Sequence, residues 1–167
     1  LVFVLALCLS LTSAKVAFTQ SFANADCSGT PDYAAAIQAP LGICVEVNCL
    51  AIGDRSMSLT CPDDMPAKPA GLAGSEVFNA ADCGADDLVA FTGAKLGDCV
   101  VYAQGVPGIK YTCTADKLTV GVNCDDGCGS CTDVEYDIEC ISANGASTQY
   151  FCGAVDFGFN AILLAVV

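Results

Sequence analysis

Cysteine is the residue type in this sequence that is most able to do chemistry. The chain has 13 cysteines and no histidine, and two of the cysteines form a Cys-x-x-Cys motif, Cys128-Gly129-Ser130-Cys131. This spacing occurs in thiol oxidoreductases, in zinc sites and among structural disulfides. A redox site needs a thiolate at the start of a helix that follows a strand, and a zinc site would draw on Cys124 and Cys140 as well. Because glycines flank the motif in a strand-rich segment, we favour structural disulfides.

Carboxylates form a second group with chemical potential. They are Asp133, Glu135, Asp137 and Glu139. The four acids alternate with apolar residues, which is the period-two pattern of a strand and puts all of them on one face. Neighbouring acids on that face are about 7 Å apart, and Ca²⁺ prefers carboxylate oxygens. Since no compact Asp-x-Asp-x-Asp-Gly loop is present, we treat them as weak metal candidates and a solvated face as the default.

The composition disfavours several classes of function. Without histidine, Ser-His-Asp and Cys-His catalysis are excluded. The net charge of −13 repels nucleic acids and anionic membrane surfaces. A carboxylate pair could hydrolyse a glycoside, but the chain has no tryptophan to stack on a sugar. We therefore expect no enzyme and no cofactor, and as partners an extracellular protein or glycan, a second copy of the chain, or calcium.

The first residues predict export of the chain. Residues 1–14 form an apolar run that ends in small residues, the pattern of a signal peptide. Removing this segment removes Cys8 and leaves twelve cysteines, an even number, in a chain bound for an oxidising compartment. We predict that all twelve form disulfides. They are Cys27, Cys44, Cys49, Cys61, Cys83, Cys99, Cys113, Cys124, Cys128, Cys131, Cys140 and Cys152.

These cysteines follow a pattern that we divide into three copies, residues 15–61, 77–113 and 114–152. Self-similarity at a period of about 40 to 55 residues is typical of folds built by repetition. Residues 62–76, rich in proline and glycine, predict a linker, and residues 153–167 an apolar tail. The second and third copies contain odd numbers of cysteines, so at least one disulfide must join them.

Most segments between the turns favour strands. Those segments are residues 16–22, 44–50, 56–61, 99–103, 109–113 and 132–140. Residues 33–39 are alanine-rich but lie between prolines, which leaves a helical turn and an edge strand both open. The apolar residues 157–167 also leave two alternatives, a final buried strand or the start of a C-terminal signal for a lipid anchor.

The repeat suggests one scheme of disulfide pairing. If each copy joins its first cysteine to its second, the pairs are Cys27 with Cys44, Cys83 with Cys99, and Cys124 with Cys140. Cys61 then pairs with Cys49. The remaining cysteines, Cys113 and Cys152, pair with Cys128 and Cys131 in either order, which supplies the bridge between the second and third copies.

The pattern also resembles a known type of protein. Phe-x-x-x-Asp-Cys-Ser-Gly-Thr-Pro at residues 22–31, Leu-Gly-x-Cys-Val at residues 41–45 and the closing Cys61 resemble cysteine-rich repeats of secreted and surface proteins of amoebae and other protists. The likeness covers the first two copies, and the third departs from it by its extra cysteines and its missing phenylalanine. The resemblance implies an extracellular structural role and carries over no catalytic residues.

We therefore predict an all-β, disulfide-rich fold of three related short-strand repeats, packed as one domain or a compact array. The predicted location is outside the cell, secreted or at the cell surface. The predicted role is structural or adhesive and not catalytic. The alternative is an extracellular binding module for carbohydrate or calcium.

Overall fold

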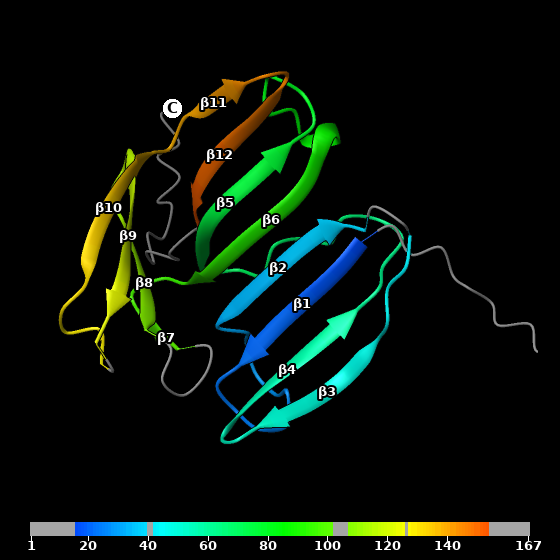
Figure 1. The fold of residues 1–167 in the computed structure, drawn as a ribbon, viewed down its shortest axis with the longest axis vertical. Coiled ribbons are helices and arrows are strands. Elements are labelled where there is room, and N and C mark those ends of the chain that lie inside the picture. The colour runs from blue at the N-terminus through cyan, green and yellow to red at the C-terminus, as the bar shows by residue number, and fades with distance from the viewer. Residues whose placement is uncertain (1–15, 40–41, 102–106, 126, 154–167) are drawn as a thin grey trace, which may run out of the picture.

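The computed structural model describes residues 16–39, 42–101, 107–125 and 127–153, and almost all regular structure in them is β-strand (Figure 1). The prediction of an all-β, disulfide-rich fold is confirmed. The strands are β1 (Val16–Phe22), β2 (Tyr33–Gln38), β3 (Val47–Ile52), β4 (Arg55–Thr60), β5 (Leu72–Phe78), β6 (Leu88–Lys95), β7 (Cys99–Val100), β8 (Gly108–Cys113), β9 (Lys117–Cys124), β10 (Thr132–Asp137), β11 (Cys140–Ala143) and β12 (Ala146–Cys152). One short 3-10 turn, η1 (Ala85–Asp87), precedes β6.

The strands form two antiparallel sheets. The main sheet has eight strands in the order β11-β12-β5-β6-β2-β1-β4-β3, and the small sheet has four in the order β10-β9-β8-β7. Figure 1 shows the small sheet standing beside one end of β5, β6 and β12. Here β8 lies against β5 and β6, and β9 lies against β12.

The main sheet consists of two similar halves that meet at the β2–β6 pair. Strands β1 to β4 form the first half, and β5, β6, β11 and β12 form the second in the corresponding order. The first strand of each half ends in the same motif, Phe-x-x-x-Asp-Cys. It runs from Phe22 to Cys27 in the first half and from Phe78 to Cys83 in the second. In the second half the strands of the small sheet are inserted between β6 and β11.

The terminal hairpins of the two halves correspond residue by residue. Cys49 in β3 corresponds to Cys140 in β11, and Cys61 after β4 corresponds to Cys152 at the end of β12. The register agrees, because Ser56 of β4 lies opposite Phe22 and its counterpart in β12 lies opposite Phe78.

The turn that follows the first strand of each half is also built in the same way. Cys27 and Cys83 adopt left-handed backbone conformations, with φ of 55° and 54°. The Ser56 hydroxyl accepts a hydrogen bond from the Cys27 N–H at 2.8 Å and donates to the Asn24 carbonyl. The Ser147 hydroxyl accepts from the Cys83 N–H at 3.1 Å and donates to the corresponding carbonyl at 2.6 Å. Both serines are buried, so each fixes its turn from inside the protein.

The six disulfides contradict the predicted pairing. The pairs are Cys27–Cys49, Cys44–Cys61, Cys83–Cys140, Cys99–Cys128, Cys113–Cys152 and Cys124–Cys131. None of the predicted pairs forms, because in each half the cysteine after the first strand bonds to the outer strand, Cys27 to Cys49 in β3 and Cys83 to its counterpart Cys140 in β11. The required bridge between residues 77–113 and 114–152 is confirmed, since three disulfides join these segments.

The division into three copies is not confirmed. The predicted boundary between residues 113 and 114 falls between β8 and β9, inside the small sheet. The structure also differs at the predicted linker, since residues 72–76 belong to β5. Residues 33–39, predicted as a helical turn or an edge strand, instead supply the central strand β2. The predicted signal peptide and the tail beyond residue 153 lie outside the described residues.

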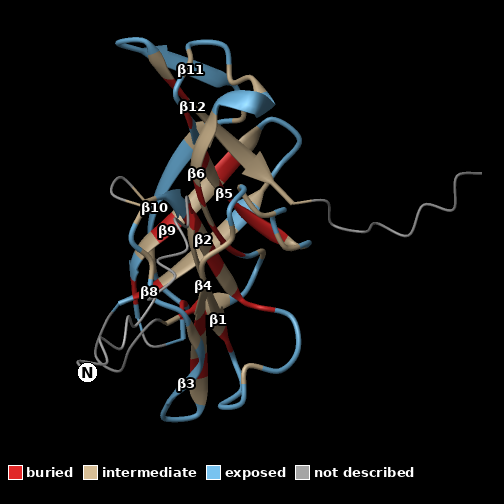
Figure 2. Ribbon diagram, turned by 90° about the vertical axis from the view of Figure 1, so that its right-hand side faces the viewer, coloured by how far each residue is buried: buried red, intermediate tan, exposed pale blue. Residues whose placement is uncertain are grey.

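The hydrophobic core covers one face of the main sheet. Its buried cluster is Val16, Ala34, Ala36, Leu72 and Phe91. The segment between β4 and β5 crosses this face, where Met65 packs against the cluster. In Figure 2 the buried residues follow the central strands, whereas the outer strand β11 is exposed. The main sheet therefore has a covered face, and its other face is available for function.

Candidate functional site

The side of the main sheet opposite the core is the largest candidate surface. We call it the open face, and strand alternation together with the register defines its residues. They are Ala17, Thr19, Ser21, Tyr33, Ala35, Ile37, Val47, Leu50, Ile52, Arg55, Met57, Leu59, Ala73, Ser75, Val77, Ala90, Thr92, Ala94, Ile141, Ala143, Ala146, Thr148, Tyr150 and Cys152.

The open face is mainly apolar, with serine, threonine and tyrosine hydroxyls among its residues, and it carries no carboxylate, although the chain has 19 acidic residues. Its only charged residue is Arg55. Large apolar side chains are exposed across it: Ile37 is 57% exposed, Leu50 47%, Ile52 50% and Ile141 51%. Where such side chains adjoin, as Leu50 and Ile52 do on one side of β3, exposed apolar surface is typical of an interaction site.

The small sheet covers one part of the open face, over the second half. Tyr136 of β10 stacks on Tyr150 with ring centroids 4.3 Å apart, and Cys113 of β8 is bonded to Cys152. Ala73 and Ala94 beneath the small sheet are fully buried. Over the first half, Cys99 and Val101 of the described chain share a cavity lining with Thr19, Ser21 and Tyr33 of the open face.

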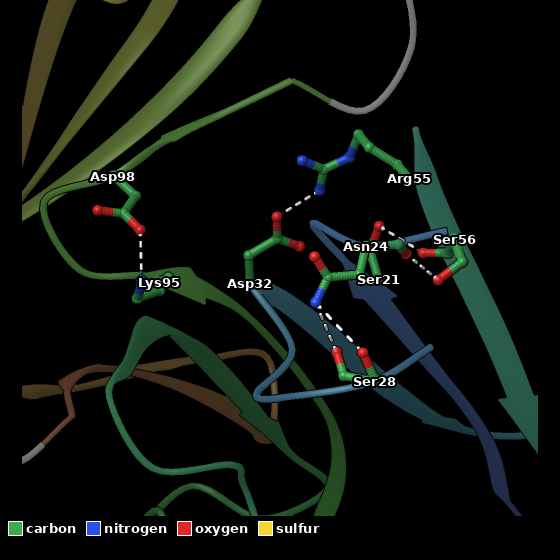
Figure 3. Close-up of polar contacts among 8 residues, drawn as sticks. All are labelled: Ser21, Asn24, Ser28, Asp32, Arg55, Ser56, Lys95 and Asp98. Carbon is green, nitrogen blue, oxygen red and sulfur yellow. Dashed lines mark hydrogen bonds and ion pairs between the residues drawn. The ribbon is translucent and has the colours of Figure 1, made fainter. Parts of the chain in front are cut away.

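A cavity of about 700 Å³ lies where the open face meets the small sheet. It is lined by residues of β1, β2, β3 and β4, by Gly53 and Asp54 of the turn between β3 and β4, and by Cys99 and Val101. Arg55 lines the cavity and forms an ion pair with Asp32 (Figure 3). The other carboxylate oxygen of Asp32, Oδ1, is buried without a hydrogen-bond donor among the described residues.

Asp32 also connects the two halves through its backbone. Its N–H donates to the Ser21 carbonyl at 2.9 Å, and its carbonyl accepts from the Lys95 N–H at 2.8 Å. The Lys95 ammonium forms an ion pair with Asp98 at 2.7 Å, in the segment that leads to the small sheet (Figure 3). The Asp32–Arg55 pair therefore lies at the junction of both halves, where a structural role accounts for it.

The acidic residues predicted as weak metal candidates lie on the outer side of the small sheet. Glu135 forms an ion pair with Lys117 of β9 at 2.8 Å, and this hydrogen bond raises the pKa of the Lys117 ammonium. Asp133 and Asp137 are exposed on the same strand, and Glu139 follows it. Within the described residues, no three of the carboxylates converge as potential metal ligands.

The cysteines of the small sheet are close together but are bonded to one another. The sulfur atoms of Cys124, Cys128 and Cys131 lie within 4.8 Å of one another. Cys124 pairs with Cys131, and Cys128 pairs with Cys99, so the Cys-x-x-Cys motif contributes to two different disulfides. Cys140, the fourth ligand of the zinc alternative, is bonded to Cys83 in the main sheet. The structure does not bring the four predicted zinc ligands together.

The tyrosines near the junction of the two sheets are engaged in packing. Burial raises the pKa of the Tyr111 and Tyr150 hydroxyls further above physiological pH. Tyr33 accepts a hydrogen bond from Thr92 at 3.2 Å. On the open face, Tyr33 and Tyr150 are the aromatic residues, so its chemistry is that of an apolar contact surface.

Comparisons with known protein families, with curated proteins and with solved structures found no match to this chain. None of the described segments forms a helix that could cross a bilayer. Six disulfides in an all-β chain of this size are typical of a protein that folds in an oxidising environment.

Proposed function

We propose that this chain is an extracellular structural or adhesive module, secreted or held at the cell surface, that works without catalysis. Its partners are proteins or glycans outside the cell, or further copies of itself. The observation that carries the proposal is the placement of two disulfides at the periphery of the main sheet. Cys27–Cys49 anchors the outer strand β3, and Cys83–Cys140 anchors the outer strand β11.

Outer strands are the first parts of a sheet to open, because they have a neighbour on one side only and little buried surface. In β3 five of the six residues are exposed, and in β11 all four are. A covalent bond from each strand to the turn in its own half keeps both edges of the sheet in place. This protection suits a protein that must keep its surface intact among extracellular proteases.

The chemistry of the sequence supports a role without catalysis. The chain has no histidine, and its cysteines in the described residues are held in disulfides. An apolar open face, by contrast, is suited to adhesion.

The experiment is to locate the protein and count its free thiols in the cells that express it. We expect an antibody to detect it in the medium or on intact cells, and a maleimide applied before reduction to label none of the twelve cysteines after residue 14. The same labelling after reduction is the control, and it should mark all twelve. A protein found only in permeabilised cells, with reactive thiols, would contradict the proposal.

A further inference from the structure

Two disulfides of the small sheet lie directly against each other. Cys124 is bonded to Cys131 and Cys128 to Cys99, yet the sulfur atoms of Cys124, Cys128 and Cys131 all lie within 4.8 Å of one another. No other three cysteine sulfurs of the described residues gather in this way. Each of these two bridges therefore has a sulfur of the other bridge beside it, which is the arrangement that thiol–disulfide exchange requires.

The two bridges border a cavity of about 230 Å³ on the outer side of the small sheet. Three of its lining residues pair with one another across β8, β9 and β10: Lys110, Gly121 and Asp133. Gly121 leaves room for a sulfur, because a Cβ at this position would lie only 3.1 Å from the Cys131 Sγ. Cys131 is partly exposed, whereas Cys128, which also lines the cavity, is buried. Cys131 is therefore the residue that a small thiol in the cavity can attack.

We propose that this pair of bridges is a thiol-exchange site for a small aminothiol, and that the exchange ends with a free thiol at Cys99. Cys99 lies at the other end of the pair, where it lines the cavity of about 700 Å³ at the open face. The protein is a stoichiometric reactant in this exchange, so the proposal goes beyond the proposed function and does not depend on it.

The exchange takes place in two steps. The entering thiolate bonds to the Cys131 Sγ, the Cys124–Cys131 bond breaks, and its electron pair leaves with the Cys124 sulfur. The Cys124 thiolate then bonds to the Cys128 Sγ. The Cys99–Cys128 bond breaks with its electron pair on the Cys99 sulfur, which takes up the proton that the entering thiol lost. One thiol and two disulfides react and one thiol and two disulfides result, so no oxidant or reductant is needed.

Burial favours the second step. A thiolate at Cys124 would be enclosed by protein, since this residue is 4% exposed, and burial disfavours an unpaired charge. Transfer to Cys99 moves the charge to a partly exposed residue of the edge strand β7. The neighbour of Cys99 across the strands is Lys110, and an adjacent ammonium stabilises a leaving thiolate. The free thiol therefore accumulates at Cys99 and not at Cys124.

The charges around Cys131 select an aminothiol. A Cβ at Gly121 would lie 3.2 Å from the Asp133 Oδ1 and 3.1 Å from the Cys131 Sγ, so this carboxylate stands beside the sulfur that is attacked. The chain as a whole carries a net charge of −13. Both features attract a thiol with an ammonium group and repel one with a carboxylate.

The test is brief exposure of the full, disulfide-bonded chain to cysteamine, followed by trapping of free thiols with an alkylating agent. Peptides are then mapped by mass spectrometry after cleavage at Asp125, which separates Cys124 from Cys128. We expect the alkylated residue to be Cys99, the added cysteamine to be on Cys131, and a new bond to join Cys124 to Cys128.

The bridge Cys27–Cys49 is the internal control. Cys49 is exposed, so cysteamine can attack it, but no third sulfur of the described chain lies beside it. This bridge closes again on its own partner, and its free thiol should be about tenfold less abundant than that of Cys99. Mercaptoacetate has the length of cysteamine and the opposite charge. The ratio of exchange at Cys131 to exchange at Cys49 should be about tenfold lower with mercaptoacetate.

Two double variants separate the two-step exchange from direct attack on the second bridge. Cys124→Ser with Cys131→Ser removes the first bridge and should slow the release of Cys99 about tenfold. This bridge has a sequence separation of 7, the shortest of the six, so its loss should destabilise the fold least. The matched control, Cys44→Ser with Cys61→Ser, removes a bridge of the first half and should leave the release of Cys99 unchanged.

Release of Cys99 at the parent rate without Cys124 and Cys131 would overturn the proposal. So would a free thiol that stays at Cys124 or forms equally at Cys49, and so would a preference of Cys131 for mercaptoacetate. If the variant without the first bridge does not fold, the peptide map of the parent chain decides by itself, because it shows which sulfur carries the cysteamine.

Discussion

Full reduction of the six disulfides is expected to abolish the cooperative unfolding transition of this protein. A disulfide typically contributes 2 to 4 kcal/mol, and a domain has a total stability of about 5 to 15 kcal/mol. Although such contributions do not add, losing all six disulfides is expected to lower the unfolding free energy by more than the whole stability of the fold. The loss includes both bridges that hold the outer strands, Cys27–Cys49 and Cys83–Cys140.

The measurement is circular dichroism during thermal unfolding, before and after reduction and alkylation. The control is the same protein treated with the alkylating agent alone, which should leave the melt unchanged because the cysteines of the described chain are in disulfides. If the reduced and alkylated chain kept its β-sheet signal and a cooperative melt, disulfides would not be what holds this fold together.

The second large effect is expected from the two buried serines that fix the turns. Ser56→Ala and Ser147→Ala each remove a hydroxyl that accepts from a cysteine N–H and donates to a carbonyl. An unsatisfied buried group costs about 1 to 3 kcal/mol, so each variant should lose that much unfolding free energy. The two losses should be similar because the two turns are built alike.

Ser58→Ala is the matched control for these variants. Ser58 lies on the same face of β4 as Ser56 and is also buried, but its hydroxyl makes no hydrogen bond to another described residue. Chemical denaturation of the oxidised variants gives the unfolding free energies of Ser56→Ala, Ser147→Ala and Ser58→Ala directly. A Ser147→Ala variant as stable as Ser58→Ala would show that the turns of the two halves are not held by equivalent serine hydrogen bonds.

The strands that the sequence predicts best are those whose pattern is local. The sequence predicts β1 and β10 correctly, because alternation and β-branched or aromatic residues indicate a strand whatever its neighbours are. Alternation also placed Tyr136 opposite the acids of β10, and the structure shows this residue packed on Tyr150 while Glu135 faces Lys117.

β2 shows how tertiary packing overrides local propensity. Its alanines suggest a helical turn, yet Ala34 and Ala36 are fully buried in the middle of the main sheet. Ala36 lies beside Phe91 and Phe18 in the register, where the large rings leave space for a small side chain. Such a position depends on residues far away in the sequence, and propensity alone does not reveal it.

The error in pairing has a different cause, because the necessary signal was present in the sequence. Cys49 and Cys61 enclose the turn Gly53-Asp54, and Cys140 and Cys152 enclose the turn Asn144-Gly145 at the same spacing. Aligning these hairpins would have matched Cys140 with Cys49. The insertion of β7 to β10 conceals this match, because it gives the second half extra cysteines that imitate a third copy.

The open face could not be predicted, because it depends on the register of eight strands from both ends of the chain. Ile37 and Ile141 share a face only through the pairings of β2, β6, β5, β12 and β11. The absence of carboxylates from that face is likewise visible only once the strands are paired.

Disulfide mapping of the unreduced protein by mass spectrometry tests the central claim, that two equivalent halves build the main sheet. Cleavage at Asp32 and after Glu46 places Cys27, Cys44 and Cys49 on separate peptides. Cleavage after Lys95 separates Cys83 from Cys99, and cleavage after Tyr150 separates Cys140 from Cys152. The structure predicts linked peptides that join Cys27 to Cys49 and, at the equivalent place in the second half, Cys83 to Cys140. Peptides that instead join Cys27 to Cys44 and Cys83 to Cys99 would contradict the equivalence of the halves and restore the three-copy arrangement.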